Sequence, residues 1–263
     1  MKQVKLIACD LDGTLLLNGA QELKPETCGL IRQLYDRGIL FFAASGRQYT
    51  NLQRLFEPVQ DLIGYLCENG CVGFYHGKRL FKEHLDWHLG QELIKAIQET
   101  EGAEVLLSGE TVSYLQPKNQ KYYYHMRDVV RNDIVLVPDI LQTEEEYMKI
   151  SVYEEGGIQD KEKWEERFGS RCTVVTGGNV WLDMMPLHVN KATGLQKILA
   201  LLSISPNECM AIGDNDNDLE ILKLVGFPVS VSSAKQSVRD ISGIETDTVE
   251  HLFERILNEE LVY

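Results

Sequence analysis

Two stretches near opposite ends of the chain place acidic residues directly after apolar runs. The first, "ACDLDGTLL", contains Asp10 and Asp12, and the second, "IGDNDNDLEIL", contains Asp214, Asp216 and Asp218. Two unit charges about 4 Å apart repel by roughly 4 kcal/mol at an effective dielectric of about 20. Carboxylates that gather therefore need a cation, and ligand sets made of oxygen atoms suit Mg²⁺.

Two further stretches could hold an anion. "FFAASGR" ends a strand-like run with Ser45 and Gly46, which offer a hydroxyl and a backbone N–H to a phosphate oxygen. Lys191, in "HVNKATG", stands at the start of a predicted helix, where acidic residues are normally favoured, so this cation indicates a nearby anion. Each stretch alone also fits an ordinary loop or a solvated lysine, and "DLDGT" alone fits an Asp-Gly turn.

The hydrophobic pattern predicts the elements that must position these residues. Short apolar runs at residues 4–10, 39–47 and 63–70 predict buried strands, and they alternate with segments of helical spacing. Residues 191–204 and 208–214 continue this pattern with a helix and a strand. The order predicts an α/β fold with a doubly wound parallel sheet, whose ligands bind beyond the carboxyl ends of the strands.

The middle of the chain has a different character. Residues 84–188 combine two helix-like segments with strand-like segments arranged in hairpin-like pairs. This order is typical of a separate α+β unit. We therefore predict a catalytic core formed by residues 1–83 and 189–263, with residues 84–188 inserted as a cap domain.

Composition limits the classes of function. The chain has 263 residues, 44% of them hydrophobic, and a net charge of -14, which argues against nucleic acid or an anionic membrane as a partner. Its apolar runs are shorter than the roughly 18 residues of a membrane span, and its start differs from a signal peptide, so we expect a cytoplasmic protein. The six scattered cysteines are interpreted as free thiols, and Cys67 and Cys71 lack the second ligand pair of a zinc site.

Taken together, four stretches resemble the haloacid dehalogenase (HAD) superfamily, and within it the Cof-type sugar phosphatases with a type-two (IIB) cap. They are "DLDGT", "ASGR", the lysine of "NKATG" and "GDNDND", in the order that this family shows, with the cap between the second and the third. The resemblance implies a HAD-like core and a phosphatase that forms an aspartyl phosphate and acts on small phosphorylated metabolites. It leaves the oligomeric state open.

The resemblance also implies roles for individual residues. Asp10 would attack phosphorus, Asp12 would protonate the leaving group and then activate water, and Lys191 would neutralise the phosphoryl oxygens and steady Asp10. The implied phosphate and substrate contacts are Thr14, Ser45, Gly46 and Asn217. The implied Mg²⁺ ligands are Asp10, the backbone carbonyl of Asp12, Asp214 and Asp218, the last two directly or through water.

Some positions remain open. Ser232 and Ser233 stand where relatives usually have Gly-Asn, which puts one contact to the active-site network in doubt. Asn69, in "ENG", fits either a wall of the phosphate pocket or a turn. The aromatic and basic run at residues 122–127 could line the substrate mouth or pack as an ordinary helix, and Asp183 could face the site from the cap.

Two rival functions use the same residues. A phosphotransferase or phosphomutase would hand the phosphoryl group of the aspartyl phosphate to a sugar instead of water, and the difference would depend on water exclusion by the cap. A non-catalytic module switched by a phosphorylated Asp is the other rival. Such a module needs neither Asp12 as acid and base nor a cap of about a hundred residues.

Overall fold

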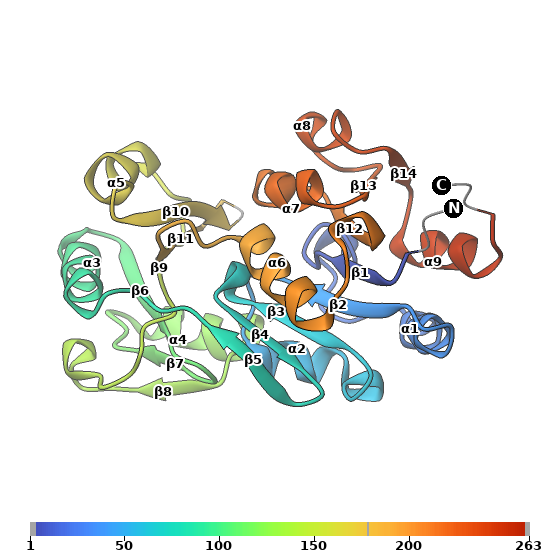
Figure 1. Ribbon diagram of the computed structural model, residues 1–263. Helices are drawn as coiled ribbons and strands as arrows, with labels where there is room; N and C mark the ends of the chain where they lie inside the picture. The colour runs from blue at the N-terminus through green and yellow to red at the C-terminus, as the bar shows by residue number, and fades with distance from the viewer. Residues whose placement is uncertain (1–3, 178, 261–263) are drawn as a thin grey trace. The chain divides into compact units, whose positions relative to one another are not determined.

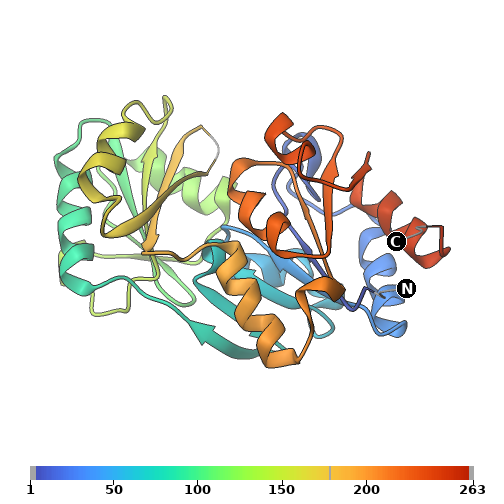
Figure 2. The ribbon, with the colours of Figure 1, turned by 45° about the horizontal axis from the view of Figure 1, so that its top comes forward.

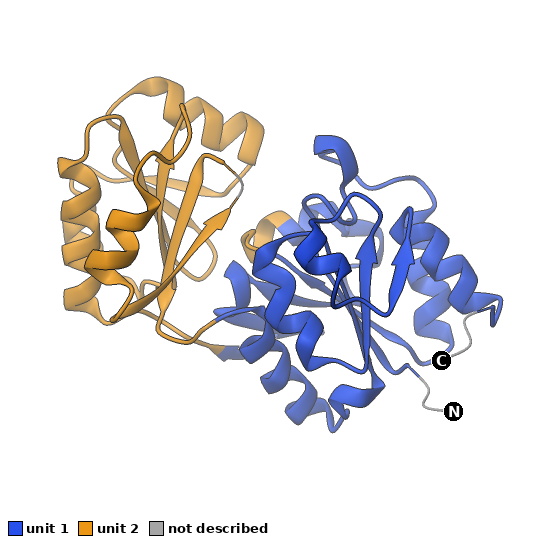
Figure 3. Cartoon of the chain, turned by 90° about the horizontal axis from the view of Figure 1, so that it is seen from above, with its two compact units in different colours: residues 1–45, 52–81, 190–263 blue, residues 46–51, 82–189 orange. Residues whose placement is uncertain are grey.

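The computed structural model describes residues 4–177 and 179–260. The chain divides into two compact units, drawn in different colours in Figure 3. The first unit comprises residues 1–45, 52–81 and 190–263, and the second comprises residues 46–51 and 82–189.

The first unit is built on an eight-stranded sheet with the order β14-β13-β12-β1-β2-β3-β4-β5 (Figure 1). The neighbouring pairs from β14 to β3 are all parallel, and β4 is antiparallel to β3. This sheet confirms the predicted α/β class. Its strands are β1 (Leu6–Cys9), β2 (Leu40–Ala44), β3 (Gly64–Cys67), β4 (Val72–Tyr75), β5 (Lys78–Lys82), β12 (Cys209–Gly213), β13 (Phe227–Val231) and β14 (Ile244–Thr246).

Helices cover both faces of this sheet (Figures 1 and 2). Helix α6 packs beside α7, and α1 packs beside α9. The second contact includes a buried carboxylate, because Glu250 of α9 accepts hydrogen bonds from Thr27 Oγ1 and Lys24 Nζ, each at 2.7 Å. The helices of this unit are α1 (Thr27–Asp36), α6 (Lys191–Leu202), α7 (Leu219–Leu224), α8 (Gln236–Arg239) and α9 (Val249–Leu257), and α2 (Tyr49–Leu55) has its first three residues in the second unit and the rest in the first.

The second unit contains a six-stranded sheet with the order β10-β11-β9-β6-β7-β8. Its pairs are antiparallel except for the parallel pair β7 and β8. The strands are β6 (Ala103–Ser108), β7 (Ser113–Leu115), β8 (Ile134–Leu136), β9 (Lys149–Glu154), β10 (Cys172–Gly177) and β11 (Trp181–Pro186). The helices are α3 (Trp87–Glu99), α4 (Gln120–Tyr124) and α5 (Lys161–Phe168), and a π-helical turn, η4 (His125–Val130), follows α4.

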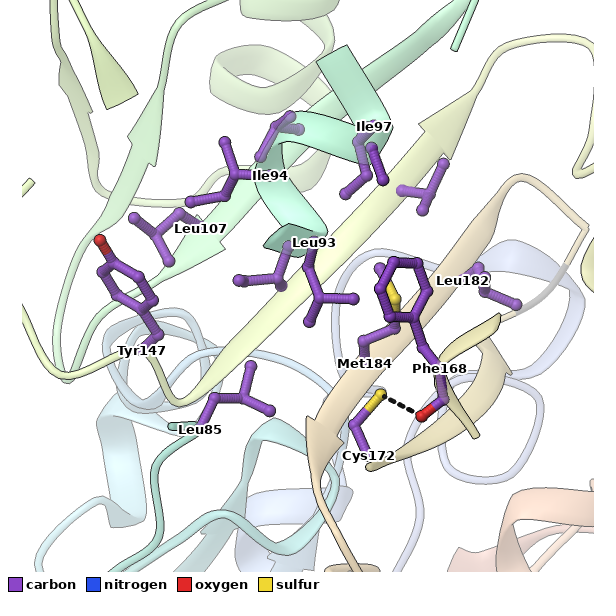
Figure 4. Close-up of a cluster of buried hydrophobic side chains, with 14 of the residues drawn as sticks. Leu85, Leu93, Ile94, Ile97, Leu107, Tyr147, Phe168, Cys172, Leu182 and Met184 are labelled. Atoms are coloured by element: carbon purple, nitrogen blue, oxygen red, sulfur yellow. Dashed lines mark hydrogen bonds between the residues drawn. The ribbon is translucent and has the colours of Figure 1, made fainter. Parts of the chain in front are cut away.

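One face of this second sheet carries the apolar core of the unit. Leu93 of α3, Phe168 of α5 and Met184 of β11 are completely buried in this cluster (Figure 4). Because side chains alternate along a strand, the neighbours of Ile150 and Val152 on β9 point to the opposite face. That opposite face bears Lys149, Ser151 and Tyr153, and its polar residues are considered further below.

The run at residues 122–127 forms α4 and the start of η4. Tyr122 and Met126 are buried in a second, smaller cluster, and the Tyr122 hydroxyl donates to the Val105 carbonyl. Arg127 is exposed and pairs with Asp128. Ordinary helix packing therefore accounts for the two buried members of the run.

Two other features follow from the same description. All six cysteines are free thiols, as the sequence indicates. Among residues 4–177 and 179–260, every helix is too short or too polar to cross a membrane.

Candidate active site

Asp10 lies directly after β1, at the carboxyl end of the parallel sheet. Its backbone N–H donates to the Ile212 carbonyl of β12 at 2.9 Å, so the ends of β1 and β12 lie side by side. Asp214 follows β12 by one residue. The parallel register therefore brings the two acidic stretches, about two hundred residues apart in sequence, to one edge of the sheet.

Lys191 connects the two stretches. Its side chain is 1% exposed, and its Nζ donates to Asp10 Oδ1 at 2.5 Å and to Asp218 Oδ1 at 2.7 Å. The helix start that carries Lys191 is fixed by Asn190, which caps α6 through a reciprocal pair of bonds with Thr193. A lysine at this helix start is thus explained by two carboxylates that share its charge.

Asp218 is fully buried, and hydrogen bonds hold both of its oxygens. Oδ1 accepts from Lys191, while Oδ2 accepts from the backbone N–H groups of Asp214 and Asn215 at 3.1 and 3.2 Å. Gly213 allows this close packing, because a Cβ at that position would lie 2.6 Å from the Cβ of Asp218. Asp218 therefore shapes the loop that presents Asp214.

Asp214 is held from the other side by the first stretch. The Thr14 hydroxyl, fully buried, donates to Asp214 Oδ1 at 2.7 Å. The family resemblance implied a phosphoryl contact for Thr14, and the structure gives its hydroxyl this carboxylate as a partner. Gly13, with φ of +94°, lies so close to the same carboxylate that a Cβ there would be 2.4 Å from Asp214 Oδ2.

The three carboxylates form a group suited to a divalent metal. One oxygen each from Asp10, Asp214 and Asp218 lies within 4.8 Å of the others. Lys191 supplies one positive charge to this group, which leaves an excess of negative charge in a buried place. Oxygen ligands of this kind fit Mg²⁺, so the residues present fit the metal that the sequence implied.

The electrostatics of the group favour the binding of a cation. Burial raises the pKa of Asp10 well above its usual range, and the charges of Asp218 and Asp214 raise it further, whereas Lys191 lowers it. The pKa of Asp214 is also raised, mainly by burial. Burial alone lowers the pKa of Lys191, but the two carboxylates beside it outweigh this effect and the net shift is upward. A divalent cation would favour the charged form of both acids.

Ser45 lies at the end of β2, next to a turn formed by η3 (Glu68–Gly70). Its backbone N–H donates to Leu66, and its carbonyl accepts from the Asn69 N–H at 3.0 Å. Gly70, with φ of +105°, contacts the backbone of Asn190 so closely that a Cβ would lie 2.2 Å from that carbonyl oxygen. The "ENG" stretch is thus a turn that contacts both Ser45 and the start of α6, which local sequence patterns could not reveal.

Other predicted site residues are placed as follows. Asp12 is exposed and forms an isolated bridge with Leu16, and it is outside the group of three carboxylates. Asn217 is half-buried in η7 (Asp216–Asp218). Gly46 follows Ser45 but belongs to the second unit. Ser232 bonds to Thr246 and Asp247, at the end of β14.

Gly13 provides a direct test of the metal group. In the Gly13→Ala variant the new Cβ would lie 2.4 Å from Asp214 Oδ2, at a backbone angle that alanine rarely adopts. Displacement of this carboxylate should lower the Mg²⁺ affinity at least about tenfold, as with other changes that misplace a ligand. The affinity is measured by following activity and the melting temperature as Mg²⁺ is added. Gly19→Ala is the matched control, because Gly19 also has positive φ but has open space around it. Equal Mg²⁺ affinity in the two variants would contradict the assignment of Asp214 to the metal group.

Comparison with known proteins adds independent information. Residues 7–251 match the haloacid dehalogenase-like hydrolase family. The chain is 26% identical over 237 residues to the 5-amino-6-(5-phospho-D-ribitylamino)uracil phosphatase YbjI of Escherichia coli, a match that covers 89% of this chain and 88% of that protein. It is 24% identical over 250 residues to the HMP-PP phosphatase of Serratia proteamaculans, covering 90% and 87%.

Solved structures share the fold. A haloacid dehalogenase-like hydrolase from Bacteroides thetaiotaomicron superposes with a TM-score of 0.85 at 22% identity, covering 97% of this chain and 100% of that one. A HAD subclass IIB sugar phosphatase superposes with a TM-score of 0.82 at 20% identity, covering 98% and 100%. These likenesses confirm the predicted fold class over nearly the whole chain.

Proposed function

Because the chain belongs to the haloacid dehalogenase-like hydrolases, we propose that it is a Mg²⁺-dependent phosphatase of small phosphorylated metabolites, with sugar phosphates as the preferred class. The observation that carries this proposal is the Asp10 carboxylate, held by Lys191 beside Asp214 and Asp218 at the carboxyl end of the sheet. The names of the relatives support the same class, since YbjI is a phosphatase of a phosphorylated ribityl compound.

The first half of the reaction forms an aspartyl phosphate. Lys191 holds Asp10 Oδ1, which orients the carboxylate so that Oδ2 attacks phosphorus. The bond from phosphorus to the leaving oxygen breaks, and Asp12 gives that oxygen a proton. Ser45 and Lys191 hold the phosphoryl oxygens. Asp10, Asp214, Asp218 and the Asp12 carbonyl would hold Mg²⁺, and the bound ion would supply positive charge to offset the negative charge that the reacting groups bring together.

The second half returns the enzyme to its starting state. Water attacks the phosphorus of the aspartyl phosphate, and Asp12 accepts the proton that the water loses. The bond from phosphorus to Asp10 breaks, which releases inorganic phosphate and regenerates the carboxylate. A carboxylate nucleophile thus replaces one difficult displacement with two easier ones. The exposed position of Asp12 is consistent with proton exchange at the substrate side of the site.

Asp12→Asn should separate the acid from the metal. We expect kcat to fall about 10²- to 10⁴-fold, the usual contribution of a positioned acid or base, while the Mg²⁺ concentration at half-saturation stays the same. An aryl phosphate whose leaving group needs no proton should suffer a smaller loss in the first step, so that rapid-quench kinetics show accumulated aspartyl phosphate. A large loss of Mg²⁺ affinity would instead assign the Asp12 side chain to the metal.

A panel of phosphorylated metabolites tests the proposed function. Phosphate release should require Mg²⁺, stop with a chelator, and be fastest for sugar or sugar-alcohol phosphates. Transfer of the phosphoryl group to an added sugar, with no inorganic phosphate released, would make the chain a phosphotransferase. An absence of phosphate release from every compound on the panel would overturn the proposal.

A further inference from the structure

A buried polar cluster lies on the second face of the sheet in the second unit. It consists of Lys149 and Ser151 of β9 and Asp183 of β11, whose exposed fractions are 4%, 0% and 5%. Ser151 and Asp183 are paired across the two strands. The Ser151 hydroxyl donates to Asp183 Oδ1 at 2.6 Å, and Lys149 Nζ donates to Asp183 Oδ2 at 3.2 Å.

Such a cluster is costly to bury. Removing an ion pair from water costs desolvation energy. The attraction between the two charges offsets this cost only when their geometry is good and further hydrogen bonds are made. Each oxygen of Asp183 already has a donor, so the carboxylate is fixed and in turn fixes the Lys149 ammonium. The fixed ammonium can therefore donate to a further acceptor in a defined position.

One such acceptor is a backbone carbonyl. Lys149 Nζ donates to the Gly46 carbonyl oxygen at 2.9 Å, across 103 residues of sequence. Gly46 directly follows Ser45, whose N–H and carbonyl are held by Leu66 and Asn69. The peptide bond between Ser45 and Gly46 is therefore held on both sides, by the backbone bonds of Ser45 and by the bond from Lys149 to the Gly46 carbonyl.

We propose that Lys149 is a positioning residue for the phosphate-binding loop. By holding the Gly46 carbonyl, it fixes a flexible glycine so that the Ser45 hydroxyl and the neighbouring backbone N–H groups are set for the transferring phosphoryl group. The inference rests on the proposed function, because that function makes Ser45 and Gly46 the phosphate loop. Asp183 and Ser151 act through Lys149.

The test uses the full chain with Lys149→Met and Asp183→Asn combined. This double variant removes the donor without leaving a buried charge, and the new amide can still accept from Ser151. We expect kcat to fall about 10- to 100-fold, the size of effect that follows small misplacements of a reacting group. Inhibition by orthovanadate should weaken by a similar factor, while the Mg²⁺ concentration at half-saturation stays unchanged.

Hydrogen exchange supplies a readout that does not need activity. Peptides covering residues 45–51 should exchange at least about tenfold faster in the double variant, whereas β9 and β11 should keep their protection. Tyr147→Phe is the matched control. It removes a buried hydroxyl that donates to the Thr143 carbonyl in the same unit, and it should leave both kcat and the exchange of residues 45–51 unchanged.

Several results would overturn the inference. They are wild-type kcat in the folded double variant, unchanged exchange at residues 45–51, and faster exchange spread over the whole sheet with normal kcat. If the double variant does not fold, Lys149→Gln replaces it, because this shorter side chain stays polar in the buried cluster but lacks the ammonium that donates to the Gly46 carbonyl. A wild-type protein without phosphatase activity would refute the proposed function, and the exchange experiment would still decide whether Lys149 holds the loop.

Discussion

The Asp10→Asn variant is expected to fold normally and to lose at least about 10⁴-fold in kcat, since removal of a covalent nucleophile has effects of this size or larger. The amide is nearly the same shape as the carboxylate but is a poor nucleophile. The variant also loses a charged oxygen from the metal group, so its Mg²⁺ affinity should fall as well. Steady-state kinetics on the best substrate of the panel measure the first effect.

The stability of this variant distinguishes lost chemistry from lost structure. Asp10 is 8% exposed and lies with two other carboxylates beside a single lysine. Removing one of the three charges lowers their mutual repulsion, and Lys191 keeps Asp218 as its partner. Without Mg²⁺, the free energy of unfolding should therefore fall by less than about 1 kcal/mol, or rise. Urea unfolding at fixed pH measures it.

Chemical trapping of the aspartyl phosphate tests the assignment of Asp10 as the nucleophile. In the wild-type protein, acid quench during turnover followed by peptide mass spectrometry should find a phosphoryl group on the peptide that contains Asp10. The Asp10→Asn protein should show none. Residual activity close to that of the wild type, or a phosphoryl group on another acidic residue, would show that the nucleophile is elsewhere.

The Lys191→Met variant should lose both stability and activity. Lys191 is the shared partner of two buried carboxylates, and breaking a buried pair from one side costs about 3 to 5 kcal/mol because the remaining charge is left unpaired. Activity should fall at least about 10²-fold, as with other groups that stabilise a developing negative charge. Urea unfolding without Mg²⁺ and steady-state kinetics with Mg²⁺ measure the two effects.

Two comparison variants test whether burial causes the expected loss of stability in Lys191→Met. Lys223 and Glu220 form a pair of the same 2.7 Å length as Lys191 and Asp218, but both are exposed. Lys223→Met should therefore change the free energy of unfolding by less than about 1 kcal/mol. Adding Asp218→Asn to Lys191→Met should restore part of the stability but not the activity. Equal stability of the Lys191 and Lys223 variants would contradict the buried bridge.

Mg²⁺ should have a larger effect on the Lys191→Met protein than on the wild type. Without the lysine, the three carboxylates have one fewer positive charge to offset their repulsion, so a bound cation replaces more of the missing attraction. A shift in melting temperature that is larger in the variant is the expected result. The same metal-dependent shift in both proteins would show that the lysine and the metal group act independently.

The sequence by itself was sufficient for the α/β class and for the positions of the main strands. Buried parallel strands are short apolar runs with a strong local signal, and acidic or small polar residues directly after them must lie at the edge of the sheet where ligands bind. Asp10, Ser45 and Asp214 could therefore be assigned to that edge from residue types and spacing alone. The roles given to them came from their resemblance to the family.

The tertiary structure decided which atoms meet. Thr14 and Asp214 are 200 residues apart, and Lys191 and Asp10 are 181 apart. Contacts at such separations depend on strand register and on close approaches such as that of Gly70 to Asn190, and these carry no local pattern. The same holds for Lys149, an ordinary polar residue in the sequence that folding buries against Asp183 and the Gly46 carbonyl. Local sequence patterns determine on which strand or helix, and at which of its ends, a side chain lies. Its contact partner is determined only when strands distant in the sequence pair.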